Sequence, residues 1–113
     1  MLYELREYEV VPGRMKSIVD RFHNVTLALF KKHGIRTLMF WEPVIGTGSR
    51  LIYMLEWNSL AEREERWDAF ASDPEWLAAK AETEKEGQIV ARVNNSILKE
   101  IPSLSAKIRE LGR

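Results

Sequence analysis

Three polar side chains alternate along the first predicted strand, residues 2–10, and could act on a small molecule. Glu4, Arg6 and Tyr8 stand two positions apart, so a strand places them on one face. A guanidinium can stabilise a carboxylate or an enolate, and a phenol can relay a proton. The spacing therefore indicates a surface that could bind an anion or support proton transfer.

A second set of polar candidates lies on the last predicted strand, residues 89–101. Its alternation places Arg92, Asn94 and Ser96 on one face. If this face and that of Glu4 both turn away from the helices, the two sets look into one interior, and aromatic residues of the middle strands form its apolar wall. The candidate ligand-binding residues are then Arg6, Tyr8, Trp41, Tyr53, Arg92 and Asn94.

The same polar residues also fit a seam between two subunits. Glu4, Arg6 and Arg92 would then pair as ions and nothing would be bound, because interfaces commonly enclose such pairs. The sequence leaves both interpretations open.

The two histidines, His23 and His33, have different surroundings. His33 stands beside Gly34 at the end of the first predicted helix, where it could carry a proton near neutral pH or bond the last carbonyls as a cap. His23 lies within that helix and is predicted to be a surface residue. His33, together with the phenol of Tyr8 described above, is therefore a catalytic candidate.

Other reactive patterns are missing from the sequence. The chain has no cysteine, which excludes disulfides and thiolate chemistry and fits a reducing compartment. His23 and His33 lack a neighbouring carboxylate motif and match no metal-ligand spacing, so we expect no metal and no cofactor. The stretch Gly46-Thr47-Gly48 joins two strands instead of opening a helix, and so lacks the geometry of a phosphate loop.

Composition narrows the classes of partner. The chain has 113 residues, enough for one domain, of which 45% are hydrophobic and 30% charged. Its 17 basic and 17 acidic side chains argue against nucleic acid or an anionic membrane as the main partner. No apolar run is long enough to span a bilayer, and the first residues include acids where a signal peptide has a positive head. We expect a cytoplasmic protein.

The elements that position the candidates follow a βαββαβ order. Such an order predicts an α+β fold in which a four-stranded antiparallel sheet carries its helices on one face. After the first strand we expect a helix from about residue 14 to 33, strands at 35–43 and 51–57 joined by a loop at 44–49, helices from residues 60 and 74, and a last strand at 89–101.

Helix boundaries and faces are predicted from capping signals and periodicity. Ser59 with Glu62 has the form of a capping box, and Asp73 caps the next helix with Pro74 at its first position. In the first helix, the apolar stripe leaves Arg21 on the solvated side. Core and helix packing is favoured over a ligand platform for the aromatic residues Trp57, Trp67, Phe70 and Trp76.

The middle strands predict a partner for the second face of the sheet. Residues 38–41 and 51–57 are apolar on both faces, whereas the helices can cover only one. A second copy of the chain would cover the other face, so that two sheets enclose a barrel-like interior. The pattern therefore predicts a homodimer.

Several motifs together resemble the NIPSNAP family. They are the stretch N-S-L-A-E-R-E-E-R-W at residues 58–67, D-P-E-W at 73–76, the Y-E-L-R strand at 3–6 with Pro12-Gly13, the His33-Gly34 pair and the Phe40-Trp41 strand. The resemblance implies a ferredoxin-like domain over residues 1–101 that pairs into a dimeric α/β barrel. The tail, residues 102–113, lies outside it; Leu104, Ile108 and Leu111 have helical spacing there and predict a helix that docks on the partner subunit.

Two classes of function remain open. In the first, the barrel holds a small apolar or anionic molecule; by analogy of fold alone, the protein could also be a cofactor-independent monooxygenase or an isomerase. Arg6 or Arg92 would then stabilise an enolate or carboxylate, while Tyr8 or His33 relays a proton. In the second class, the protein is a non-catalytic dimeric interaction module whose contact is the helix at 60–70 or the tail. The sequence does not decide whether the protein is an enzyme.

Overall fold

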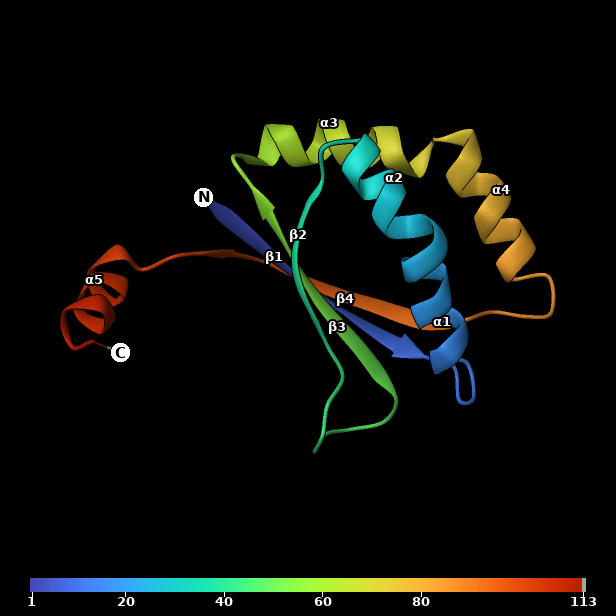
Figure 1. Ribbon diagram of the computed structural model, residues 1–113, viewed down its shortest axis with the longest axis horizontal. Coiled ribbons are helices and arrows are strands. Elements are labelled where there is room, and N and C mark those ends of the chain that lie inside the picture. Colours follow the sequence, from blue (N-terminus) through green and yellow to red (C-terminus); the bar gives the residue numbers. More distant parts are fainter. Residues whose placement is uncertain (113) are drawn as a thin grey trace.

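The computed structural model describes residues 1–112. Four strands and a series of helical segments alternate along the chain (Figure 1). In chain order they are β1 (Leu2–Val10), α1 (Met15–Arg21), the π-helical η1 (Phe22–Thr26), α2 (Leu27–Lys32), β2 (Arg36–Trp41), β3 (Arg50–Trp57), α3 (Leu60–Ala71), α4 (Pro74–Thr83), β4 (Val90–Lys99) and α5 (Pro102–Glu110).

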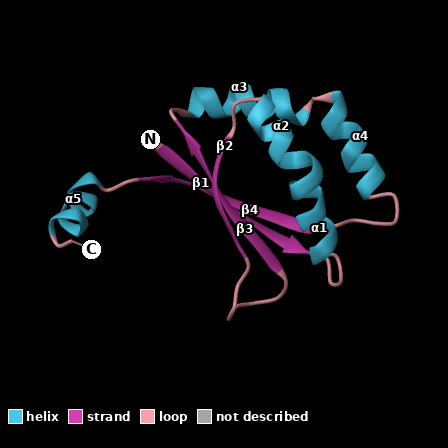
Figure 2. Ribbon diagram, viewed as in Figure 1, coloured by secondary structure: helices cyan, strands magenta, loops and turns pink. Residues whose placement is uncertain are grey.

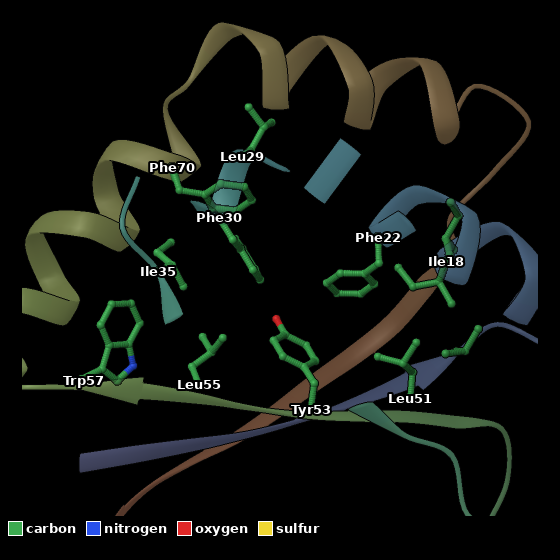
Figure 3. Packing of buried hydrophobic residues seen from close by; sticks show 12 residues of the cluster. Ile18, Phe22, Leu29, Phe30, Ile35, Leu51, Tyr53, Leu55, Trp57 and Phe70 are labelled. Atoms are coloured by element: carbon green, nitrogen blue, oxygen red, sulfur yellow. The ribbon is translucent and has the colours of Figure 1, made fainter. Parts of the chain in front are cut away.

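The strands form one antiparallel sheet in the order β2-β3-β1-β4. β1 pairs with β3 from Leu2 opposite Trp57 to Glu9 opposite Arg50, and its other edge pairs with β4. Helices α1 to α4 lie over one face of this sheet (Figures 2 and 3). The other face, called the bare face below, is covered by none of the elements in residues 1–112. The predicted α+β, ferredoxin-like architecture is therefore confirmed.

The core lies between the sheet and this helical layer. β3 alternates strictly, with Leu51, Tyr53, Leu55 and Trp57 buried and the residues between them partly exposed. The buried side chains point up from the sheet toward the helices, and the Tyr53 hydroxyl points the same way (Figure 3). They pack against the buried helical residues Ile18, Phe22, Leu29, Phe30 and Phe70.

The first helical segment differs from a regular helix at its centre. One continuous helix was predicted, but η1 inserts a π-helical turn between α1 and α2. The buried positions Ile18, Phe22, Thr26 and Phe30 are each four residues apart, because a π-helical turn holds more residues than an α-helical one. Arg21, three residues after Ile18 and just before the π-helical turn, is also buried, although it was predicted to lie on the solvated side.

The caps of α3 and α4 follow the predicted chemistry. Ser59 Oγ accepts a hydrogen bond from the Glu62 amide at 3.1 Å, and Asp73 Oδ1 accepts one from the Glu75 amide at 2.8 Å. The Glu62 carboxylate turns back to the Asn58 amide, one residue before the cap amide of an ordinary capping box. α4 ends at Thr83, before the predicted start of the last strand at residue 89.

The tail forms the helix α5 beyond the end of β4, apart from the helical layer (Figure 1). Its apolar residues Leu104, Ile108 and Leu111 are 57%, 52% and 72% exposed. More than half of the surface of each of these side chains is therefore open to solvent. None of the helices in residues 1–112 combines the length and the apolar character that a bilayer crossing needs.

Candidate ligand site between the sheet and the helices

The predicted polar face of β1 exists, but it turns toward the helices. Glu4, Arg6 and Val10 are buried, and Arg6 stands opposite Tyr53, which faces the helical layer. The expectation that this face points away from the helices was wrong. A buried acid and a buried arginine are tolerated there because each finds charged and hydrogen-bonding partners.

The two predicted polar sets do not share one interior. On β4, Arg92 stands opposite Glu9 and Asn94 opposite Glu7, which places both on the bare face of the sheet. The residue that joins the buried face is Asn95, which stands opposite Arg6. The predicted grouping of Asn94 with Arg6 was therefore wrong by one position along the strand.

The fully buried Glu4 carboxylate is the centre of a hydrogen-bond cluster. It accepts five hydrogen bonds: from Arg63 Nε at 2.7 Å, Arg6 Nη1 at 2.9 Å, Trp57 Nε1 and Asn95 Nδ2 at 3.0 Å, and Arg63 Nη2 at 3.1 Å. Burial alone would raise the pKa of Glu4, but the hydrogen bonds from Arg63, Asn95 and Arg6 outweigh it and lower the pKa to about 2. The cluster thus holds an ionised acid between two arginines.

A chain of hydrogen bonds leads from this cluster toward the helices. Arg6 Nε donates to the Tyr53 hydroxyl at 2.8 Å, and the Tyr53 and Tyr8 hydroxyls are also 2.8 Å apart. The Arg6 guanidinium carbon lies 4.3 Å from the centre of the Trp67 ring, a cation–π contact. Burial raises the pKa of Tyr53 well above its ordinary value, so this phenol keeps its proton at neutral pH.

A cavity of about 420 Å³ lies next to this chain of hydrogen bonds, between the sheet, η1 and α4. That volume is within the range of small-molecule sites. Its aromatic lining consists of Phe22, Phe30, Trp67, Phe70 and Trp76. The polar side chains that border it are Arg6, Tyr8, Arg21, Thr26, Lys80, Glu84, Gln88 and Arg92.

Arg21 is the buried charge of this cavity that the chain leaves incompletely paired. Its Nη1 lies 3.3 Å from Thr83 Oγ1 and 3.7 Å from Glu84 Oε2, and the guanidinium lies 5.1 Å from the Trp76 ring centre. Its buried Nε has no hydrogen-bond partner within residues 1–112. Burial lowers the pKa of Arg21 and the nearby Glu84 opposes that shift, while guanidinium remains charged in proteins.

The predicted ligand residues have separate fates. Arg6 and Tyr8 border the cavity, and the Tyr53 hydroxyl is hydrogen-bonded to that of Tyr8. Arg92 reaches the cavity rim, but its guanidinium is mostly exposed and lies 3.5 Å from Glu9 on the bare face. The remaining two do not join them: Asn94 is on the bare face and Trp41 borders a different groove.

The catalytic candidate His33 lies outside the cavity lining. Its Nε2 is 2.7 Å from Asp73 Oδ2, which Lys32 Nζ approaches to 2.8 Å. Hydrogen bonds from Lys32 and then His33 hold the pKa of Asp73 well below its ordinary value. Because Asp73 also caps α4, His33 connects the end of α2 to the start of α4. The other histidine, His23, is exposed as predicted.

Sequence reasoning missed Arg21 and the lining role of Trp67, Phe70 and Trp76. The aromatic residues were predicted to pack the core in preference to forming a ligand platform, and they do pack, since the Phe70 ring centre lies 4.9 Å from that of Trp76 and 5.3 Å from that of Trp67. Their helical spacing was a usable signal for a cavity wall. Arg21 also had a signal, because it stands three residues after Ile18 and four before Val25, which belong to the same apolar stripe.

A second groove of about 570 Å³ runs along the edge formed by α1, η1 and β2. Most of its lining is apolar, including Met15, Val19, Leu27, Phe40 and Trp41. Its polar neighbours Lys16 and His23 are exposed, in contrast to the buried donors of the first cavity. The first cavity is therefore the better candidate for specific recognition.

Comparison with protein families places these features in a known group. The sheet order and the single helical layer define a ferredoxin-like α+β protein with a cavity between the layers. Residues 3–104 match NIPSNAP, so nearly the whole chain is included and the chain belongs to the NIPSNAP family. Comparison with curated proteins gave no match.

Solved structures with the same fold include family members and more distant proteins. A NIPSNAP family protein with unknown function from Agrobacterium tumefaciens is 22% identical, with a TM-score of 0.78 over 88% of this chain and 87% of that one. A putative antibiotic biosynthesis monooxygenase from Nitrosomonas europaea is 8% identical, with a TM-score of 0.62 over 89% and 99%. A variant of MhuD with two manganese protoporphyrin IX molecules per active site is 18% identical, with a TM-score of 0.58 over 89% and 95%. At these identities, the similarity shows the fold alone.

Proposed function

We propose that this protein binds a small molecule with an aromatic body and an anionic group in the cavity between the sheet and the helices. The observation that carries this proposal is the buried Arg21 Nε, which has no partner within the described residues. An unpaired buried donor costs free energy comparable to a lost hydrogen bond. A ligand carboxylate or similar oxygen at this nitrogen removes that cost.

The charge balance of the cavity favours an anion. Arg6, Arg21 and Lys80 border the space together with a single acid, Glu84, and Arg6 is already paired with Glu4. In a partly dehydrated site, an anion near Arg21 and Lys80 interacts more strongly than it does in water. Recognition of the charged group is therefore assigned to the α1 and α4 side of the cavity.

The walls of the cavity favour a flat aromatic body. Trp67, Phe70 and Trp76 come from α3 and α4, while Phe22 and Phe30 come from the segments around the π-helical turn. Aromatic rings pack well against other rings at edges and faces. The fold is also seen with planar protoporphyrin rings in the MhuD variant, which supports the class of ligand without identifying it.

Isothermal titration with 1-naphthoate and its neutral analogue 1-naphthalenemethanol tests this proposal. We expect Arg21→Gln to weaken naphthoate binding about tenfold or more while changing alcohol binding little, because the lost interaction is charge-assisted. Arg109→Gln, on the exposed helix α5, is the matched control and should change neither affinity. Equal affinities of the wild-type protein and the Arg21 variant for naphthoate would contradict the proposal.

Native mass spectrometry of protein purified gently from its own host gives an unbiased second test. We expect a reproducible additional mass on the wild-type protein that is lost from the Arg21→Gln variant. The extra mass would also identify candidates for the natural ligand. An additional mass that stays bound to the Arg21 variant would place the ligand elsewhere on the chain.

The phenol at the cavity favours one further candidate, an isomerase or cofactor-independent monooxygenase that acts through an enolate. Tyr8 borders the cavity and connects to the positively charged Arg6 through Tyr53, an arrangement suited to a developing oxyanion. The ligand recovered from the host protein would be incubated in deuterated water with the wild-type protein and with Tyr8→Phe. Deuterium uptake that requires Tyr8 supports catalysis, and no uptake with either protein leaves binding alone.

We also propose that two copies of the chain pair through the bare sheet face, with α5 of each docking on the other subunit. This face has an apolar surface, formed by Leu5, Ile52, Met54 and Leu98. The apolar side chains of α5 are more than half exposed in the single subunit. Sedimentation analysis of the wild-type protein should give a dimer. Met54→Glu should produce monomers, whereas the control Leu77→Glu, on the exposed side of α4, should not.

A chain ending at Ile101 tests the role of α5 in this dimer. Removal of residues 102–113 should weaken dimerisation and leave the fold of the monomer intact, since the apolar side chains Leu104, Ile108 and Leu111 are more than half exposed in the single subunit. Unchanged dimerisation would contradict the docking of α5 on the partner.

A further inference from the structure

The direction of the hydrogen-bond chain beneath the cavity follows from its first member. Arg6 Nε can only donate, and it lies 2.8 Å from the Tyr53 hydroxyl oxygen. That oxygen therefore accepts the Arg6 proton. The Tyr53 hydroxyl hydrogen must point elsewhere.

The Tyr53 hydrogen has one acceptor available in the described part of the chain. Tyr53 is 0% exposed, and besides Arg6 its hydroxyl contacts only the Tyr8 hydroxyl, at 2.8 Å. If Tyr8 instead donated to Tyr53, the buried Tyr53 hydrogen would have no acceptor, and an unsatisfied buried donor is costly. Tyr53 therefore donates to Tyr8.

This order leaves the Tyr8 hydrogen free of Tyr53. The Tyr8 side chain borders the cavity, and no second acceptor for its hydroxyl lies within hydrogen-bond distance in residues 1–112. We propose that Tyr8 is a hydrogen-bond donor directed into the cavity, and that the ligand places an anionic oxygen of the phenolate, enolate or carboxylate class against it. This inference rests on the proposed function and specifies the ligand class.

The positive charge at the start of the hydrogen-bond chain strengthens the Tyr8 hydroxyl as a donor. Glu4 stands between Arg6 and Arg63, so the cluster of one acid and two arginines keeps one positive charge. Hydrogen bonds in series polarise one another at low dielectric. Because Arg6 donates to Tyr53 and Tyr53 to Tyr8, the hydroxyls of both tyrosines donate more strongly than an isolated phenol.

The probe for this inference is 4-nitrophenol, whose absorbance distinguishes the phenol from the phenolate. The wild-type protein should bind the phenolate preferentially, so that the bound probe ionises at a lower pH than the free probe. Tyr8→Phe should weaken phenolate binding about ten- to a hundredfold, the range for a hydrogen bond to a charged group, and should reduce the spectral shift. Tyr53→Phe keeps the Tyr8 donor but removes its polarisation, and a smaller loss of about threefold to tenfold is expected.

The third tyrosine of the chain supplies a matched control. Tyr3 lies on the same strand as Tyr8 but stands opposite Leu98, on the bare face of the sheet. Tyr3→Phe should leave the affinity and the spectrum of the bound probe unchanged. Thermal unfolding of all three variants checks that each remains folded at the temperature of the titration.

The outcomes separate this inference from the proposed function. Binding that depends on Arg21 but is unchanged in Tyr8→Phe would overturn the Tyr8 assignment alone. Absence of binding by the wild-type protein, to both 4-nitrophenol and 1-naphthoate, would overturn both proposals. Binding with equal losses in the Tyr3 and Tyr8 variants would place the probe outside the cavity and also contradict the assignment.

Nuclear magnetic resonance of the wild-type protein with carbon-13 at tyrosine Cζ provides a test that needs no substitution. Addition of 4-nitrophenolate should move the Tyr8 signal most, the Tyr53 signal less and the Tyr3 signal least, because the effect passes along the hydrogen-bond chain. A Tyr8 signal that does not respond to saturating probe would contradict the inference.

Discussion

Two buried arginines border the same cavity, yet their surroundings differ. Arg6 pairs with Glu4, donates to Tyr53 and stacks on Trp67. Arg21 has a long contact to Glu84, a hydrogen bond to Thr83 and the Trp76 ring at 5.1 Å, but its Nε has no partner in residues 1–112. The comparison teaches that a buried charge completed by the fold contributes to folding, whereas one left incomplete is available to a ligand.

Substitution of Glu4 should give the largest effect on stability. Glu4→Gln removes the charge that holds Arg6 and Arg63, and leaves buried guanidinium groups without their counterion. We expect the free energy of unfolding to fall by about 3 kcal/mol or more, measured by urea denaturation. Glu7→Gln is the control on the opposite face of β1, where the Arg50 contact is 4.0 Å long, and should change stability by less than about 0.5 kcal/mol. Similar losses of unfolding free energy in Glu4→Gln and Glu7→Gln would contradict the view that the buried cluster around Arg6 contributes to folding.

Acid should remove the contribution of Glu4 in a defined range of pH. The pKa of Glu4 falls from 4.5 to about 2 on folding, so its contribution to stability is present above pH 4.5 and is lost as the pH falls toward 2. Between these values the wild-type protein should lose stability more steeply than Glu4→Gln, while the contribution of Asp73 is common to both. Urea denaturation at a series of pH values measures this, and parallel curves would show that Glu4 is not the group concerned.

Substitution of Arg21 should have the smallest effect on stability and so sharpens the comparison. Arg21→Met keeps an apolar stem of similar length and removes a donor that the chain leaves unpaired. We expect the free energy of unfolding to change by no more than about 1 kcal/mol in either direction, together with loss of naphthoate binding. A destabilisation as large as that of Glu4→Gln would show that Arg21 serves folding instead of recognition.

Much of the fold could be predicted from local patterns. The alternation of β1 placed Glu4, Arg6 and Tyr8 on one face, and the caps at Ser59 and Asp73 fixed the starts of two helices. These features depend on residues close together in the chain, and their physical rules are local. The same rules give the order of elements along the chain, βαββαβ, and predict that one face of the sheet needs a partner.

The candidate site could be predicted only in part, because alternation does not say which face meets the helices. That choice depends on Arg63, which is 59 residues away from Glu4 along the chain and completes its cluster. Trp41 and Asn94 were consequently grouped with residues from which the sheet separates them. Arg21 was missed because its charge assigned it to the solvated side, although it stands three residues after the buried Ile18.

The π-helical turn implies that the chemistry of the cavity is encoded partly by length and not only by residue identity. Each residue removed from a helix rotates everything before it by about 100° relative to everything after it. Deletion of one exposed residue of η1, such as Asn24, would restore a regular helix and rotate Arg21, with the rest of α1, relative to Thr26 and Phe30, without changing the identity of any residue that lines the cavity. Relatives that differ by one residue in this segment would therefore be expected to differ in the charge of the molecule they accept.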